Sequence, residues 1–127
     1  MLPLMCQKQA LIAILDDEEA FRRALSRLLK TNGFDVATFA TGAELVNEVR
    51  SRRFDCILLD LYMPGMTGID VLAELRWNPE APPTIVITAH DDPDLLKRVL
   101  ALNAFECQCK PISEATLLDA IDRALHR

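Results

Sequence analysis

The chain has 127 residues, of which 50% are hydrophobic and 26% charged, and its formal net charge is −5. A single domain usually holds about 100–150 residues, so this composition indicates one globular core and excludes a disordered or collagen-like chain. The acidic excess argues against direct nucleic-acid binding, because nucleic-acid phosphates are neutralised by Lys and Arg.

The chain begins with a short apolar segment that lacks the features of a targeting sequence. No basic region precedes it, and no apolar run in the chain approaches the ~20 residues of a membrane-spanning helix. We therefore expect residues 1–9 to be a leader and residues 10–127 to form one domain of a cytoplasmic protein without membrane contact. The four cysteines lack metal-ligand spacing, so we expect reduced thiols buried in the core.

Five short segments read as β-strands. A continuous apolar run such as Ala10–Leu15 is typical of a strand covered on both faces. The predicted strands are residues 10–15, 35–39, 56–59, 84–88 and 106–109.

Segments with helical periodicity separate these strands. The first carries an apolar stripe that begins at Phe21, and Asn32-Gly33 marks its end because Gly accepts left-handed backbone. Asp92 and Ser113 are typical N-caps of two later helices. After the first helix, the predicted helices are residues 43–50, 68–76, 94–102 and 113–125. Strands that alternate with helices predict an α/β fold, with a single doubly wound parallel sheet of five strands and five helices.

Polar side chains stand at the ends of four predicted strands. Asp16 and Asp17 follow the first strand, and Asp60 follows the third. Thr88 ends the fourth strand, and Lys110 follows the fifth. The carboxyl ends of parallel strands meet at one edge of a sheet, where open α/β folds bind ligands. We therefore expect these side chains to lie together.

This residue set indicates phosphoryl chemistry. Three carboxylates in one cleft repel one another, which indicates a bound cation. Mg²⁺ prefers oxygen ligands and neutralises charge on phosphoryl oxygens. Lys110 can pair with the same oxygens, and Thr88 can donate a hydrogen bond to one of them. Asp60 is the candidate nucleophile, because a carboxylate can accept a phosphoryl group as an aspartyl phosphate.

The constellation resembles the receiver domain of the response regulators of two-component systems. The matching segments are Ile14–Glu18, Leu58–Gly68, Ile87–Ala89 and Cys109–Pro111. The resemblance implies a flavodoxin-like receiver fold with strand order 2-1-3-4-5. It also implies that Asp60 accepts a phosphoryl group from a sensor histidine kinase or a histidine phosphotransfer protein. Such a domain phosphorylates and dephosphorylates itself and is not otherwise an enzyme.

The resemblance further implies a metal site beside Asp60. Asp17, Asp60 and the backbone carbonyl of Tyr62 would coordinate Mg²⁺ or Mn²⁺. Asp16 would act through a bound water. Tyr62 and His90 would flank the path of an attacking water, so we expect them to tune the lifetime of the phosphoryl group.

The resemblance also predicts how the signal leaves the site. Lys110 would contact the phosphoryl oxygens, Thr88 would move toward them, and the peptide bond after Lys110 is expected to be cis. Receivers usually carry Tyr or Phe three residues before the lysine, whereas this chain has Cys107, with Phe105 two residues earlier. We therefore expect a switch that does not use an aromatic side chain. The fourth helix, fifth strand and fifth helix, residues 94–121, would act by homodimerisation or by binding an output partner in transcription.

Several alternatives stay open on the sequence. A stand-alone receiver in a phosphorelay and a module that binds partners without phosphorylation both fit these motifs. Trp77 either covers a helix end or is an exposed contact point. Four basic residues of the first helix form either a solvated face or a docking site for an acidic partner; they are Arg22, Arg23, Arg27 and Lys30.

Overall fold

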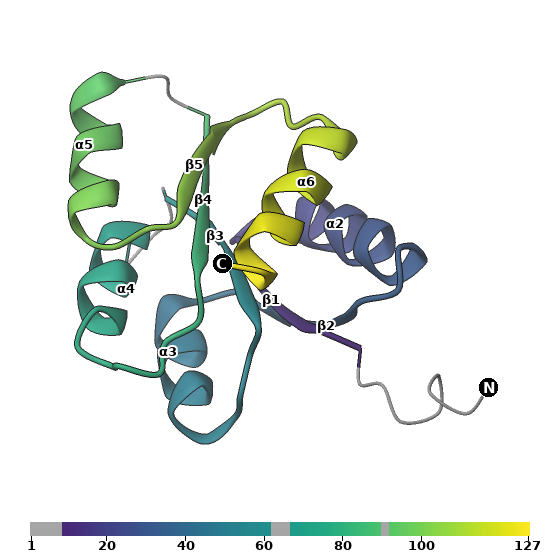
Figure 1. The fold of residues 1–127 in the computed structure, drawn as a ribbon, viewed down its shortest axis with the longest axis horizontal. Helices are drawn as coiled ribbons and strands as arrows, with labels where there is room; N and C mark the ends of the chain where they lie inside the picture. The colour runs from purple at the N-terminus through teal and green to yellow at the C-terminus, as the bar shows by residue number, and fades with distance from the viewer. Residues whose placement is uncertain (1–8, 62–66, 90–91) are drawn as a thin grey trace.

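Five parallel strands form one central sheet with helices on both faces (Figure 1). The computed structural model describes residues 9–61, 67–89 and 92–127. Its strands are β1 (Leu11–Leu15), β2 (Asp35–Phe39), β3 (Cys56–Asp60), β4 (Thr84–Thr88) and β5 (Glu106–Cys109). Their order in the sheet is β2-β1-β3-β4-β5, which confirms the predicted topology.

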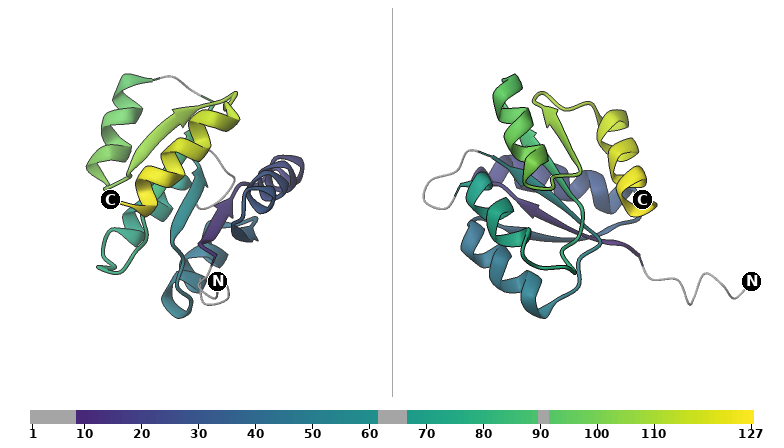
Figure 2. Two further views of the ribbon diagram at one scale, coloured as in Figure 1. Left: turned by 45° about the vertical axis from the view of Figure 1, so that its right-hand side comes forward. Right: turned by 60° about the vertical axis from the view of Figure 1, so that its left-hand side comes forward.

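Within the described residues, one helix follows each of the five strands. They are α2 (Glu19–Thr31), α3 (Gly42–Ser51), α4 (Gly68–Leu75), α5 (Pro93–Ala101) and α6 (Glu114–Leu125). Helices α2 and α6 cover one face of the sheet, and α3, α4 and α5 cover the other (Figures 1 and 2). None of the described helices combines the length and hydropathy that crossing a bilayer requires.

Local sequence signals set the ends of these helices. The side chains of Asp92 and Ser113 each accept a hydrogen bond from a backbone N–H in the first turn of α5 and α6, as predicted. Gly33 follows α2 at a φ of +88°, and Asn103 follows α5 at a φ of +69°. Gly and Asn tolerate this left-handed region, so both helices end where the chain can turn.

The described cysteines occupy different environments. Cys56 is buried in β3, and this burial raises the pKa of its thiol to about 12, so the thiol is inert. The prediction of buried thiols is wrong for Cys109, which is exposed because it ends an edge strand. Cys107 is half-buried on the face under α3–α5. Cys6 lies outside the described residues.

Candidate functional site

Three carboxylates meet at the carboxyl edge of the sheet, as predicted. Asp16 and Asp17 follow β1, and Asp60 is the last residue of β3. β1 and β3 are neighbouring parallel strands, so their carboxyl ends lie side by side. One carboxylate oxygen from each of these three residues lies within 4.8 Å of the other two, so the cluster could hold a metal ion.

The three carboxylates differ in their surroundings. Asp16 and Asp60 are only 2% and 7% exposed, whereas Asp17 is open to solvent. The Oδ1 atom of Asp16 accepts a hydrogen bond from the backbone N–H of Glu18 at 2.8 Å. Burial, and then the negative charge of Asp16, raise the pKa of Asp60 to about 6 against the opposing charge of Lys110. The ionised form of Asp60 is therefore disfavoured at this site, and a bound cation would stabilise it.

Lys110 brings a positive charge to the two buried carboxylates. Its Nζ lies 3.4 Å from Oδ2 of Asp16 and 3.9 Å from Oδ1 of Asp60. The same Nζ lies 4.2 Å from the centroid of the Phe21 ring. The sequence assigned Phe21 only to an apolar stripe, because helical periodicity does not show that a ring reaches a lysine after β5.

Thr88 occupies the neighbouring strand end. It is the last residue of β4 and is buried. Asp60 is paired with Ile87 in the sheet, so Thr88 lies one residue farther along β4 at the same edge. The Thr88 carbonyl accepts a hydrogen bond from the Lys110 N–H at 2.7 Å. The peptide bond between Lys110 and Pro111 is cis, as expected.

The predicted switch position, Cys107, does not carry an aromatic side chain. Cys107 packs on the face of the sheet under α3–α5, whereas Phe105 packs on the opposite face, under α2 and α6. Phe105 therefore does not replace an aromatic side chain at Cys107. The predicted tuning residues Tyr62 and His90, with the Tyr62 carbonyl, lie outside the described residues.

Helix α2 supports the loop that carries the first two aspartates. Arg22 donates from Nη1 to the backbone carbonyl of Asp16 at 2.7 Å. Arg22 thus belongs to the scaffold of the site, which the sequence did not reveal. The other three basic residues of α2 are exposed, and Arg23 pairs with Glu19 at 2.6 Å.

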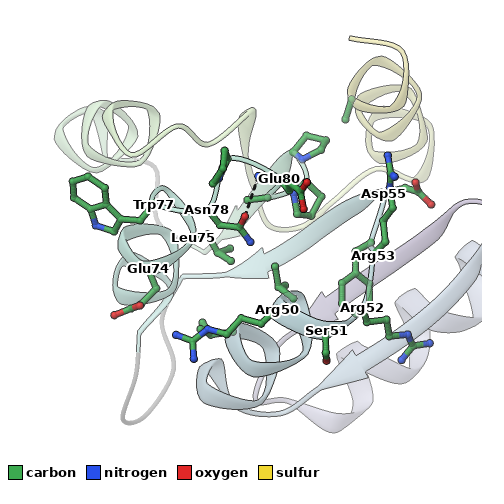
Figure 3. A pocket seen from close by; sticks show the side chains of 18 of the residues that line it. Arg50, Ser51, Arg52, Arg53, Asp55, Glu74, Leu75, Trp77, Asn78 and Glu80 are labelled. Atoms are coloured by element: carbon green, nitrogen blue, oxygen red, sulfur yellow. Dashed lines mark hydrogen bonds between the residues drawn. The ribbon is translucent and has the colours of Figure 1, made fainter.

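A separate groove lies at the opposite edge of the sheet (Figure 3). Its volume is about 1020 Å³, and residues before β3 and β4 line it, with charges of both signs that include Arg53, Asp55 and Glu74. Trp77 at this groove is 75% exposed, so its side chain does not cover the helix end. The Arg76 guanidinium lies 4.6 Å from the centroid of the Trp77 ring. Among the described residues, none of those predicted for the site lines this groove.

Comparisons with known proteins agree with this geometry. A model of the response regulator receiver domain matches residues 12–122. The response regulator protein TodT of Pseudomonas putida is 35% identical over 121 residues, which are 95% of this chain and 53% of TodT. The DNA-binding transcriptional regulator NtrC of Escherichia coli is 30% identical over 118 residues, which are 93% of this chain and 25% of NtrC. This chain thus spans about half the length of TodT and a quarter of NtrC.

A solved structure shows the same fold. The chemotaxis protein CheY4 of Vibrio cholerae superposes with a TM-score of 0.88 at 29% identity. The superposition covers 93% of this chain and 100% of the CheY4 chain. The fold of this chain is therefore that of a solved structure over nearly the whole chain.

Proposed function

We propose that this chain, which belongs to the response regulator receiver domain family of two-component systems, accepts a phosphoryl group on Asp60. The observation that carries the proposal is the carboxylate cluster with an ammonium beside it: Lys110 Nζ lies within 4 Å of two of the three aspartates. The donor is the phosphohistidine of a sensor histidine kinase or of a histidine phosphotransfer protein. The reaction takes place in the cytoplasm.

The transfer requires a nucleophile and groups that stabilise charge. A carboxylate oxygen of Asp60 forms a P–O bond while the N–P bond of phosphohistidine breaks. The electron pair leaves with the imidazole nitrogen, which takes up a proton. Lys110 neutralises charge on the phosphoryl oxygens, and Thr88 donates a hydrogen bond to one of them.

Mg²⁺ or Mn²⁺ is the cofactor that the oxygen donors fit. When bound, the ion neutralises charge on the transferring phosphoryl group. Asp17 and Asp60 would hold the ion directly, and Tyr62, which lies outside the described residues, would contribute its backbone carbonyl. Asp16 would act through a water, because its Oδ1 already accepts a hydrogen bond from a backbone N–H and its Oδ2 accepts one from the Lys110 ammonium.

Intact-mass spectrometry tests this function. The protein is incubated with acetyl phosphate in the presence of MgCl₂ and, in parallel, of EDTA. We expect a mass gain of one phosphoryl group with MgCl₂ and none with EDTA. A chain that gains no mass from acetyl phosphate or from a phosphorylated histidine kinase would contradict the proposal and favour a module that binds without phosphorylation.

Asp17→Asn is expected to weaken Mg²⁺ binding at least tenfold while leaving the metal-free protein as stable as wild type. Asp17 is exposed, so its removal changes the free energy of unfolding by no more than about 0.5 kcal/mol. Titration of Mg²⁺ followed by the thermal midpoint measures the affinity. Glu18→Gln is the matched control, because it removes an adjacent exposed charge whose side chain caps nothing. Equal Mg²⁺ affinities for the two variants would exclude Asp17 as a ligand.

The proposed output surface consists of α5, β5 and α6. Two leucines of α5 are exposed on it, Leu96 by 41% and Leu100 by 45%. One turn separates them, so they form one apolar patch. This patch suits a homodimer or an output partner, and relatives such as NtrC suggest that the output is transcriptional.

Leu100→Gln is therefore expected to leave phosphorylation unchanged and to reduce phosphorylation-dependent self-association. Size-exclusion chromatography with light scattering, with and without phosphodonor, measures this difference. A monomeric wild type in both conditions would favour a stand-alone receiver in a phosphorelay.

Tyr62→Ala and His90→Ala test the proposed tuning of the phosphoryl lifetime through the dephosphorylation rate.

A further inference from the structure

We infer that Phe21 is a positioning residue that holds Lys110 at the phosphorylation site through the face of its ring. This inference rests on the proposed function. Nζ of Lys110 lies 4.2 Å from the ring centroid, well inside the ~6 Å over which a ring face attracts an ammonium group. Phe21 is half-buried and packs against the core under α2 and α6, so the core holds the ring in place.

The two contacts of the Lys110 ammonium with described carboxylates change during the proposed reaction. Asp16 and Asp60 attract its Nζ as negative carboxylates, at 3.4 and 3.9 Å. Both carboxylates would attract Lys110 less with the positive charge of a metal ion beside them. Asp60 also becomes an acyl phosphate. The attraction of the uncharged Phe21 ring is independent of both events.

A constant partner would limit the motion of the Lys110 side chain, which is long and partly buried. A lysine side chain released into solvent gains rotational entropy, and re-forming its contact with the phosphoryl oxygens then costs that entropy again. The ring keeps Nζ near the site while the carboxylates interact with the metal ion or the phosphoryl group. An aliphatic residue at position 21 would fill the apolar stripe equally well and would attract no cation.

Two variants separate the ring from its apolar packing. Phe21→Leu keeps an apolar side chain and is expected to lower the rate of phosphorylation by acetyl phosphate about two- to tenfold at saturating Mg²⁺. Phe21→Tyr keeps the ring and is expected to restore the wild-type rate. In a Lys110→Met background, Phe21→Leu is expected to have no further effect, because the partner of the ring is absent. Denaturant unfolding of each variant verifies that it is folded.

NMR supplies a readout that does not depend on phosphorylation. In the wild type, with and without Mg²⁺, the ring current is expected to shift the Lys110 ε-methylene protons upfield. Phe21→Leu removes this shift, and Phe21→Tyr retains it. Two results would overturn the role of Phe21. One is an ε-methylene chemical shift of Lys110 that Phe21→Leu leaves unchanged. The other is a wild type that is phosphorylated by acetyl phosphate no faster than Phe21→Leu. A wild type that cannot be phosphorylated would instead contradict the proposed function.

Discussion

Asp60→Asn is expected to abolish the phosphoryl mass gain and to make the metal-free protein more stable at neutral pH. The first effect follows because an amide cannot accept the phosphoryl group. The second follows because Asp60 is 7% exposed and lies beside Asp16, which together raise its pKa to about 6. The ionised carboxylate is thus destabilised in the folded protein, and asparagine removes that charge.

The sign of this stability effect gives it a defined pH range. A carboxyl whose pKa is higher in the folded than in the unfolded state stabilises the fold below the unfolded value, near 4. That contribution is lost as the pH rises through the folded value of about 6. Asp60→Asn has no carboxyl group there and does not lose this stability. Its free energy of unfolding is expected to exceed that of the wild type by nearly zero at pH 4 and by about 1–3 kcal/mol at pH 7.

Urea unfolding of both proteins in EDTA, at several pH values, measures this difference. Adding Mg²⁺ is expected to stabilise the wild type more than Asp60→Asn, because the variant lacks one ligand. The control is Glu80→Gln, which removes an exposed carboxylate at the groove on the opposite edge of the sheet. If Asp60→Asn were less stable than wild type at pH 7 in EDTA, the ionised Asp60 carboxylate would not destabilise the folded protein as described.

Gly68→Ala is expected to lower the free energy of unfolding by about 2–4 kcal/mol and to slow phosphorylation. A Cβ atom on Gly68 would lie 2.6 Å from the Asp60 carbonyl oxygen and 2.6 Å from Cα of Leu61. Both are backbone atoms that cannot rotate away. Gly68 also donates its N–H to the Leu61 carbonyl at 2.9 Å, so helix α4 would have to move away from the end of β3.

Gly33→Ala is the matched control for this prediction. Gly33 has a φ of +88° and open space around it, so alanine there meets only the left-handed backbone penalty of about 1–2 kcal/mol. Phosphorylation of Gly33→Ala is expected to be unchanged, since this turn precedes the amino end of β2 whereas Asp60 lies at the carboxyl end of β3. Denaturant unfolding and the acetyl phosphate reaction compare the two variants. Equal stabilities and rates for Gly68→Ala and wild type would contradict the close approach of α4 to β3.

The order of the elements and most of the site could be predicted because they follow from local patterns. Apolar runs and helical stripes fix the strands and helices to within one residue at most ends. The rule that parallel strands end at one edge then brings Asp60, Thr88 and Lys110 together. Burial of the cysteines was predicted less well, because an apolar neighbourhood in sequence does not distinguish an edge strand, where Cys109 lies, from a central one.

The remaining features depend on side-chain direction and on close backbone approach. Arg22 was one of four basic residues with the same apparent role, and its bond to Asp16 depends on which way it leaves α2. The contact of Phe21 with Lys110 joins the first helix to the last strand end, and no spacing in the sequence encodes it. Gly68 is required because two backbone segments meet there, which periodicity cannot show.

Locating the phosphoryl group tests the central claim most directly. The protein is phosphorylated with acetyl phosphate and Mg²⁺, and sodium borohydride then reduces the acyl phosphate to an alcohol, which converts that aspartate to homoserine. Peptide mass spectrometry identifies the converted position. We predict conversion at Asp60 and at neither Asp16 nor Asp17. Conversion at Asp16 or Asp17, or a stable phosphoryl group on a histidine, would contradict the assignment of Asp60 as the acceptor.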